Sequence, residues 1–117
     1  MIQITNIFKL LSDDTRLRIM LLLFQKDLCV CEISGILNVS QPSVSKSLSK
    51  LRDLNLVTDE RREKFVFYSL KKDNVFLTHT LNQILAQADK YPQLLEDSNR
   101  LENKDVFLNL CCPVFEQ

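Results

Sequence analysis

Apolar residues recur at helical spacing through most of the chain, so the pattern predicts a mainly α-helical protein. A short amphipathic helix is expected first, and its apolar face consists of Ile4, Ile7, Phe8 and Leu11. The next helix, through about Phe24, is apolar on nearly all sides and is therefore expected in the middle of the fold. Ser12 is expected to cap the N-terminus of this second helix, ahead of two aspartates in its first turn.

Two helices joined by a tight turn are predicted between about residues 30 and 54, which is the outline of a helix-turn-helix. The first helix, at about 30–37, is followed by Asn38, a residue that readily takes the left-handed conformation found after helix ends. Ser40 is expected to cap the second helix, where Pro42 in the first turn loses no hydrogen bond. The inward stripe of that second helix consists of Val44, Leu48 and Leu51.

The opposite face of the second helix is hydrogen-bonding and basic, which suits a helix that lies in the major groove of DNA. An ordinary solvated face is the weaker interpretation, because serine is a mediocre helix former and several exposed serines gain the helix nothing. The predicted DNA contacts on and beside this helix are Ser40, Gln41, Pro42, Ser43, Ser45, Lys46, Ser49 and Lys50.

From about residue 56 to residue 70 the apolar period changes to two, which predicts a β-hairpin. Its strands are expected at 56–60 and 65–70, with the charged residues 61–64 as the turn. A hairpin with a basic tip, directly after a DNA-reading helix, is typical of the wing of a winged helix-turn-helix and would reach the phosphate backbone or the minor groove. The predicted wing contacts are Arg61, Arg62 and Lys64.

A further helix at about 74–89 has an apolar seam for which so small a chain leaves no partner, so the seam predicts a homodimer interface. The seam consists of Leu77, Leu81, Ile84, Leu85 and Ala88. Residues 1–117 are taken as a single domain that ends in a C-terminal segment at 90–117. The pattern does not predict how the polar stretch at 96–105 packs.

Charge and composition narrow the class of protein. The 117 residues carry no net charge, yet residues 41–72 hold eight bases and four acids, a distribution that fits a nucleic-acid footprint. The longest apolar run is far shorter than a membrane span, and the N-terminus lacks the features of a signal peptide. We therefore expect a cytoplasmic protein with no membrane partner, in which cysteines stay reduced.

The four cysteines form two close pairs: Cys29 and Cys31 within DLCVCE at 27–32, and the adjacent Cys111 and Cys112 near the C-terminus. Thiolate is a soft ligand that selects thiophilic ions such as As(III), Sb(III), Cd(II), Pb(II) or Zn(II). Cysteines are also common as small buried apolar residues, which is the plainer interpretation of an isolated one. The close pairing favours ligation.

Four stretches resemble, in order and spacing, the ArsR/SmtB family of metal- and metalloid-responsive repressors, and most closely its arsenic-responsive branch. They are LSDDTRLRIMLLL, DLCVCEI, NVSQPSVSKSLSKL and EKFVFYSL, within about residues 5–85. SQPSVSKSLSKL is similar to the family's recognition helix, and LCVCE to the sensor motif of its arsenic and cadmium/lead branches. The resemblance implies a winged-helix homodimer that blocks its own promoter and releases it when an inducer binds.

The chain departs from the family pattern at three positions. Ser34 stands where the arsenic repressors often carry a third cysteine, and Glu63 stands where the wing usually has a glycine. The family's zinc site on the dimer helix needs several histidines and carboxylates, whereas here that helix holds His79 alone. That zinc site is rejected, and His79 is expected to be a capping or core histidine.

Two sulfurs alone make a weak site, so we expect Cys111, Cys112 or both to join Cys29 and Cys31, within one protomer or across the dimer. Trigonal As(III) needs three sulfurs, and Cd(II) or Pb(II) can use three or four. Residues i and i+2 of a regular helix face different sides, so ligation by Cys29 and Cys31 is expected to distort the first turn of their helix. That distortion would tilt the recognition helices out of register with the operator half-sites.

The expected function is a DNA-binding repressor that As(III) or Sb(III) releases from double-stranded operator DNA, with no organic cofactor. The alternatives are a repressor responsive to Cd(II), Pb(II) or Zn(II), and a thiol-redox-sensing repressor that uses the same cysteines. A metal buffer would not need the serine- and lysine-rich helix face. An enzyme is not expected, because the chain has one histidine, no glycine-rich phosphate loop and no C-x-x-C.

Overall fold

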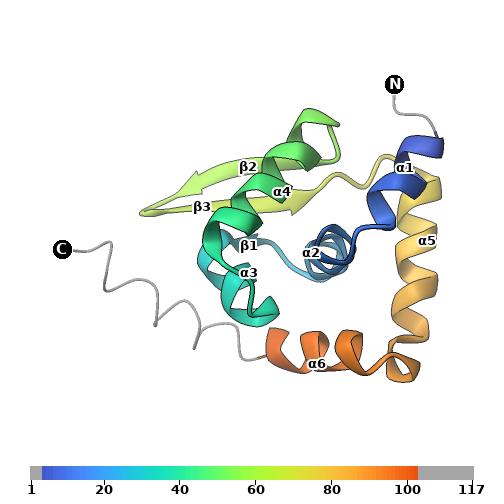
Figure 1. Ribbon diagram of the computed structural model, residues 1–117. Coiled ribbons are helices and arrows are strands. Elements are labelled where there is room, and N and C mark those ends of the chain that lie inside the picture. Colours follow the sequence, from blue (N-terminus) through green and yellow to red (C-terminus); the bar gives the residue numbers. More distant parts are fainter. Residues whose placement is uncertain (1–3, 103–117) are drawn as a thin grey trace.

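The computed structural model describes residues 4–102 of the chain. Most of the described chain is helical, and a small antiparallel sheet extends to one side of the helices (Figure 1), which confirms the predicted class, mainly helical with a small β-hairpin. The elements in chain order are α1 (Ile4–Leu11), α2 (Asp14–Gln25), β1 (Leu28–Cys29), α3 (Val30–Leu37), α4 (Gln41–Asp53), β2 (Val57–Arg62), β3 (Phe65–Leu70), α5 (Val75–Ala86), η1 (Ala88–Lys90) and α6 (Pro92–Leu101).

The central position predicted for the second helix is confirmed, because α2 lies among the other helices and its residues 19–23 are all buried (Figure 1). Its N-cap is Asp13, whose carboxylate accepts a hydrogen bond of 3.0 Å from the backbone N–H of Arg16. The expectation that Ser12 caps this helix is therefore wrong. The Ser12 hydroxyl instead donates to the carbonyl of Lys9, one turn back at the end of α1.

The two helices of the predicted helix-turn-helix are α3 and α4, and the turn between them has the expected chemistry. Asn38 has φ 56° and ψ 46°, the left-handed conformation that asparagine tolerates. The Ser40 hydroxyl accepts from the backbone N–H of Ser43, and Pro42 lies in the first turn of α4. The stripe predicted to face inward is fully buried and consists of Val44, Leu48 and Leu51.

The sheet has three strands in the order β1-β3-β2, and β1 was not predicted. A strand of two residues is too short to show a period of two, and β1 exists because Leu28 and Cys29 pair with Tyr68 and Phe67 of β3. The hairpin turn is also shorter than expected, because β2 continues through Arg62, which pairs with Phe65. Arg61 and Arg62 therefore belong to a strand and not to the turn.

Glu63 begins that shorter turn with φ 57°. A glycine would take this left-handed conformation without the steric strain that a β-carbon introduces. Glu63 therefore holds, at the tip of the wing, a left-handed backbone conformation that glycine would adopt with less strain.

The apolar seam on α5 faces the interior of the same protomer. Leu77 and Leu81 are fully buried, and α5 packs against α2. The argument that this seam lacks a partner is therefore wrong, because the central helix supplies one. His79 is exposed on α5 and is not a core residue.

A different apolar surface is exposed on α1 and α5, and we call it the α1/α5 patch. It consists of Ile4, Phe8, Val75 and Phe76. The rings of Phe8 and Phe76 pack edge to face with centroids 5.7 Å apart, so the two helices lie side by side at this point (Figure 1). Within residues 4–102, no helix combines the length and the apolar character needed to cross a bilayer.

Candidate thiol site and nucleic-acid interface

Cys29 and Cys31 lie where β1 meets α3, the first helix of the helix-turn-helix. Cys29 ends the strand and is the N-cap of α3, with an extended backbone at φ −93° and ψ 169°, whereas Cys31 lies in the first helical turn. Both side chains are buried, with 3% and 5% of their surface exposed. The expectation that both belong to a regular helix is wrong, so the argument that ligation must distort the first turn does not apply to this pair.

The surroundings of Cys29 favour its neutral form. Burial raises the pKa of the Cys29 thiol to about 11, and the negative charge of Glu32 adds to the rise. The Glu32 carboxylate is fully buried and accepts a 3.1 Å hydrogen bond from the backbone N–H of Cys29. Glu32 thus holds the start of α3 in place. Its spacing, three residues after the N-cap, is that of a capping box and could have been noticed in the sequence.

Among residues 4–102, no group of three or more histidines, cysteines, aspartates or glutamates is placed to hold a metal ion. The described chain therefore contributes two of the four thiols predicted as ligands, and Cys111 and Cys112 lie outside the described residues. Ser34, at the position of the family's third cysteine, has another role here. Its hydroxyl donates a 2.6 Å hydrogen bond to the carbonyl of Val39 and ties α3 to the turn before α4.

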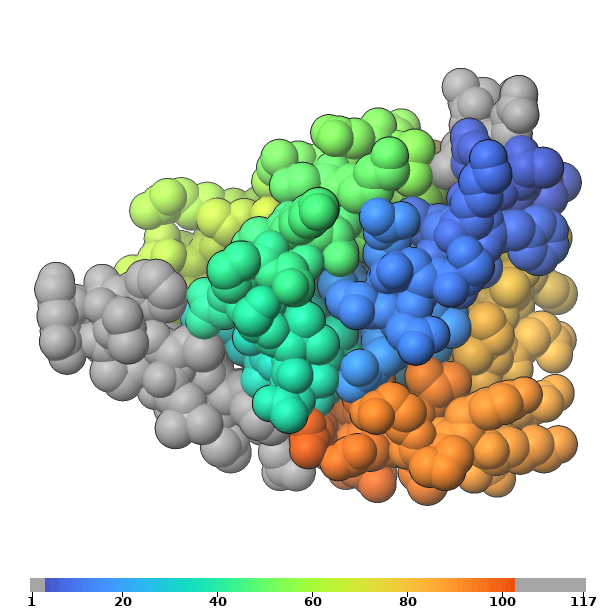
Figure 2. All heavy atoms as spheres, viewed as in Figure 1, coloured from blue at the N-terminus to red at the C-terminus, as the bar shows by residue number. Residues whose placement is uncertain are grey.

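The predicted DNA-contacting residues of α4 lie largely on an open surface beside α3 (Figure 2). Gln41 differs, because it is half-buried and its side-chain Nε2 lies 3.8 Å from Cys31 Sγ as a hydrogen-bond donor. One predicted DNA contact and one predicted thiol ligand therefore touch each other. The exposed members are Ser40, Pro42, Ser43, Ser45, Lys46, Ser49 and Lys50.

The two wing arginines point to opposite faces of β2, because neighbouring strand residues alternate. Arg61 shares its face with Asp59, whose carboxylate pairs with Arg52 of α4 at 2.8 Å, so this face is turned toward α4. Arg62 lies on the other face, where it pairs with Glu60 at 2.7 Å and with Asp27 at 3.0 Å. These hydrogen bonds to Glu60 and Asp27 raise the pKa of Arg62. Arg61 is thus the better placed of the two to share a ligand with α4.

The C-terminal end of α3 is held by two arginines, an arrangement that we call the α3–α6 clamp. Arg18 of α2 forms a two-pronged ion pair with the buried Asp97 of α6, at 2.8 and 2.9 Å, and also donates to the carbonyl of Leu37. Arg100 of α6 donates to the carbonyl of Ile36. The hydrogen bond to Asp97 raises the pKa of Arg18. Nothing in the polar sequence of this region indicated that Asp97 is buried.

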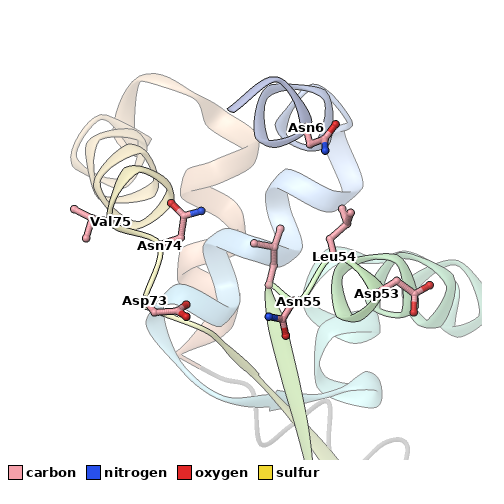
Figure 3. Close-up of a pocket in the computed structure, with 8 residues that line it drawn as sticks. Asn6, Asp53, Leu54, Asn55, Asp73, Asn74 and Val75 are labelled. Carbon is pink, nitrogen blue, oxygen red and sulfur yellow. The ribbon is translucent and has the colours of Figure 1, made fainter. Parts of the chain in front are cut away.

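An open pocket of about 700 Å³ lies at the other end of α4 and is formed by α1, the end of α4 and the start of α5 (Figure 3). Asn74 and Asn55 at this pocket have structural roles, because Asn74 caps α5 and Asn55 accepts a hydrogen bond from Lys71. The oxygen-rich lining does not suit a thiophilic ion. The length of α4, about 20 Å for thirteen residues, separates this pocket from the thiols.

Comparison with known protein structures supports the winged fold. The transcriptional repressor BigR from Xylella fastidiosa superposes with a TM-score of 0.64 at 26% identity, over 71% of this chain and 83% of that one. The antimony-specific transcriptional repressor AntR superposes with a TM-score of 0.63 over 77% of this chain and 80% of that one. The identity to AntR is 24%, a likeness that concerns the fold alone.

Sequence comparison identifies the family. The family described as "Bacterial regulatory protein, arsR family" matches residues 13–59. The arsenic resistance transcriptional regulator ArsR2 of Pseudomonas putida is 37% identical over 116 residues, covering 96% of this chain and 100% of that protein. The arsenical resistance operon repressor of Escherichia coli is 45% identical over 66 residues, covering 56% of each chain. The chain is therefore not an enzyme: it belongs to the ArsR family of bacterial DNA-binding transcriptional repressors.

Proposed function

We propose that the chain represses transcription from its operator and is released when As(III) or Sb(III) binds to Cys29 and Cys31. One or both of Cys111 and Cys112 supply the further sulfur that a trigonal site needs. The observation that carries this proposal is the burial of two thiols together at the start of α3, where the helix-turn-helix begins. The printed functions of the Pseudomonas and Escherichia relatives, both in arsenic resistance, support the choice of metalloid.

The operator contacts follow from the surface that surrounds the thiols. The N-terminal half of α4 would enter the major groove, with serines at base edges and lysines near phosphates. The wing would bring positively charged side chains to the phosphate backbone of the DNA. The proposed contacts are Ser40, Gln41, Pro42, Ser43, Ser45, Lys46, Ser49 and Lys50 on or beside α4, and Arg61, Arg62 and Lys64 on the wing.

A second copy of this chain is the proposed protein partner, and the α1/α5 patch is its contact surface. Val75 is 71% exposed and Phe8 is 56% exposed, although both are large apolar side chains. Contiguous exposed apolar residues on a small protein commonly mark an interface between proteins. Two-fold symmetry would place one recognition helix in each of two operator half-sites about one helical turn apart.

The chemistry of the inducer determines how its binding depends on pH, so this dependence distinguishes a metalloid such as As(III) from a divalent metal ion. Neutral arsenous acid and three thiols give a trithiolate and three waters, so no proton is released while the thiols are protonated. Cd(II), Pb(II) or Zn(II) must displace one proton from each thiol. Since burial raises the pKa of the Cys29 thiol to about 11, affinity for a divalent ion should rise steeply between pH 6 and pH 8, roughly tenfold per pH unit for each thiol bound.

The redox alternative is less well supported by the described residues. Sensor cysteines that react with oxidants are exposed and have a low pKa. Cys29 is buried and has a raised pKa, and Cys31 is 5% exposed. Both properties slow attack on an oxidant, so a metalloid that exchanges water for sulfur fits the surroundings better.

The proposal is tested by fluorescence anisotropy of an operator fragment from upstream of the gene, under reducing conditions. The protein–DNA complex is titrated with As(III), Sb(III), Cd(II), Pb(II) and Zn(II) at pH 6 and pH 8, for the wild type and for the Cys111→Ser/Cys112→Ser variant. We expect As(III) to release the wild type equally at both pH values and to fail with the variant. Failure of As(III) and Sb(III) to release the wild type would contradict the proposal, and release by Cd(II) alone would identify a divalent ion as the inducer instead.

A further inference from the structure

Gln41 connects the two helices of the helix-turn-helix through its side chain. It is the first residue of α4, and its side-chain Nε2 donates toward Cys31 Sγ across 3.8 Å. Its neighbours Ser40, Pro42 and Ser43 are exposed, whereas Gln41 is half-buried between the two helices of the helix-turn-helix. The contact therefore links the first turn of α3 with the first turn of α4, ten residues further along the chain.

The same side chain is chemically suited to read DNA. A glutamine amide can form two hydrogen bonds with the edge of an adenine in the major groove. The residues at the N-terminus of a recognition helix are those that contact base edges. The Gln41 amide thus lies between a proposed thiol ligand and the proposed DNA surface, and it cannot reach far from the sulfur while the contact of 3.8 Å persists.

We infer that Gln41 is the positioning residue through which occupancy of Cys31 is transmitted to DNA, an inference that rests on the proposed function. A thiol sulfur accepts the Gln41 amide only weakly. When that thiol reacts with arsenous acid, its proton leaves with one arsenic hydroxyl group as water and an As–S bond replaces the S–H bond. The arsenic atom then takes up space beside the amide. Gln41 then leaves its place, and the first turn of the recognition helix changes the group that it presents to DNA.

The alternative route is a rigid movement of α3 that carries α4 with it through their apolar contacts. Ile33 and Ile36 of α3 and Val44 and Leu48 of α4 are fully buried in one core, so such a movement would not depend on the Gln41 amide. The two routes therefore differ in what they require of Gln41. The quantity that separates them is the coupling factor, which is the ratio of operator affinities without and with As(III).

The first experiment measures that factor by anisotropy for the wild type, Gln41→Met and Ser45→Ala. Methionine keeps the length of the side chain and removes the amide. Ser45 is exposed on the same face of α4 and serves as the matched control. Inducer coupling in proteins is commonly about 5–150-fold. We expect Gln41→Met to lower the factor about tenfold with undiminished As(III) binding by thiolate absorbance, and Ser45→Ala to change operator affinity at an unchanged factor.

A second experiment needs no DNA and therefore decides the matter even if Gln41→Met binds the operator too weakly to measure. The side-chain amide resonance of Gln41 is followed by ¹⁵N-correlated NMR and assigned from its loss in Gln41→Met. We expect As(III) to shift this resonance in the wild type, and Cys31→Ser to shift it in the absence of As(III). An amide resonance that ignores both changes would overturn the inference.

The outcomes separate this inference from the proposed function. Release of the wild type and of Gln41→Met by equal factors overturns the role of Gln41 and leaves the arsenic-responsive repressor intact. Failure of As(III) to release the wild type overturns the proposed function and, with it, the inference. A lowered factor in Gln41→Met together with a shifted amide supports both.

Discussion

At the scale of single residues, the local environment determines what each predicted site residue can do. Cys29 is a ligand candidate by type, but burial and the nearby Glu32 carboxylate decide that its thiol is protonated at neutral pH. Arg61 and Arg62 are neighbours with the same charge, yet the strand sends them to different faces and only Arg62 has two acidic partners.

The raised pKa of Cys29 predicts that its thiol is alkylated slowly in the folded protein. A variant that keeps only this cysteine (Cys31→Ser/Cys111→Ser/Cys112→Ser) should react with iodoacetamide at pH 8 roughly 100-fold more slowly than after denaturation, because alkylation requires the thiolate. The folded thiol stays protonated above pH 9, where the unfolded one ionises, so the difference should persist until the pH approaches about 11. Equal rates for the folded and denatured protein at pH 8 would contradict the assignment.

The two wing arginines should differ in their contribution to DNA binding. Arg61→Gln should lower the slope of log affinity against log salt concentration by roughly 1, the value for one lost phosphate contact. Arg62→Gln should change the slope less, because Arg62 is already engaged by Glu60 and Asp27. Anisotropy titrations over a range of salt concentrations measure both slopes. Equal decreases in the slope for the two variants would show that Arg62 exchanges its acidic partners for a phosphate when the protein binds DNA.

At the scale of elements, α3 begins at the proposed thiol site and is held at both ends. Glu32 secures its start through the backbone of Cys29, and Arg18 and Arg100 hold the last carbonyl groups. Ser34 ties the middle of the helix to the turn before α4. Because α3 is held in this way, a displacement at its thiols would be transmitted to α4 and would not be absorbed by movement within α3 itself.

The α3–α6 clamp should contribute strongly to stability. Asp97→Asn removes the buried carboxylate that pairs with the half-buried Arg18 and should lower the free energy of unfolding by about 1.5–3 kcal/mol, the range for hydrogen bonds to charged groups. Glu96→Gln is the matched control, because Glu96 forms an exposed ion pair with Arg100 one helical turn away and should cost only about 0.3–0.5 kcal/mol. Urea unfolding followed by circular dichroism measures both. Equal effects would contradict the buried clamp.

Ser34 offers a gain-of-function test of the thiol site. Residues 31 and 34 are three apart on α3 and share a helix face, so Ser34→Cys would add a third sulfur beside Cys31. We expect the Cys111→Ser/Cys112→Ser variant to resist As(III), and the added Ser34→Cys substitution to restore release from the operator. Loss of the Ser34 hydrogen bond to Val39 should lower stability by about 1 kcal/mol. An As(III) response still absent after the substitution would contradict a site at the start of α3.

At the scale of the whole molecule, the apolar surfaces divide between the core and a proposed partner. The seam of α5 closes the protomer against α2, and the α1/α5 patch remains exposed beside it. One face of α5 thus packs against the core, and the other face belongs to the patch that we propose as the contact with a second copy of the chain.

A charge in the α1/α5 patch should separate the protomers. Val75→Glu should shift the protein toward monomer in analytical ultracentrifugation and weaken operator binding, because a buried carboxylate opposes the contact and one half-site alone binds weakly. Leu95→Glu, at an exposed apolar residue on α6, is the matched control and should leave the oligomeric state unchanged. A Val75→Glu protein that remains dimeric would place the interface elsewhere.

The sequence by itself determined the parts of this protein that depend on local chemistry. The helical period, the Asn38 turn, the Ser40 cap and the period-two wing each occupy a few neighbouring residues, so their pattern is visible in one dimension. The motifs around the cysteines and the recognition helix likewise indicated the family. The ends of elements were less certain, as the misplaced cap at Ser12 and the shortened wing turn show.

Only the tertiary structure decided the contacts between distant residues. Arg18 and Asp97 are 79 residues apart, Cys29 joins a strand because Phe67 lies beside it, and Gln41 reaches Cys31 across the turn. The same is true of the α5 seam, whose partner is the central helix of its own protomer. No local period records which surface another segment will cover, because burial depends on how the whole chain is packed.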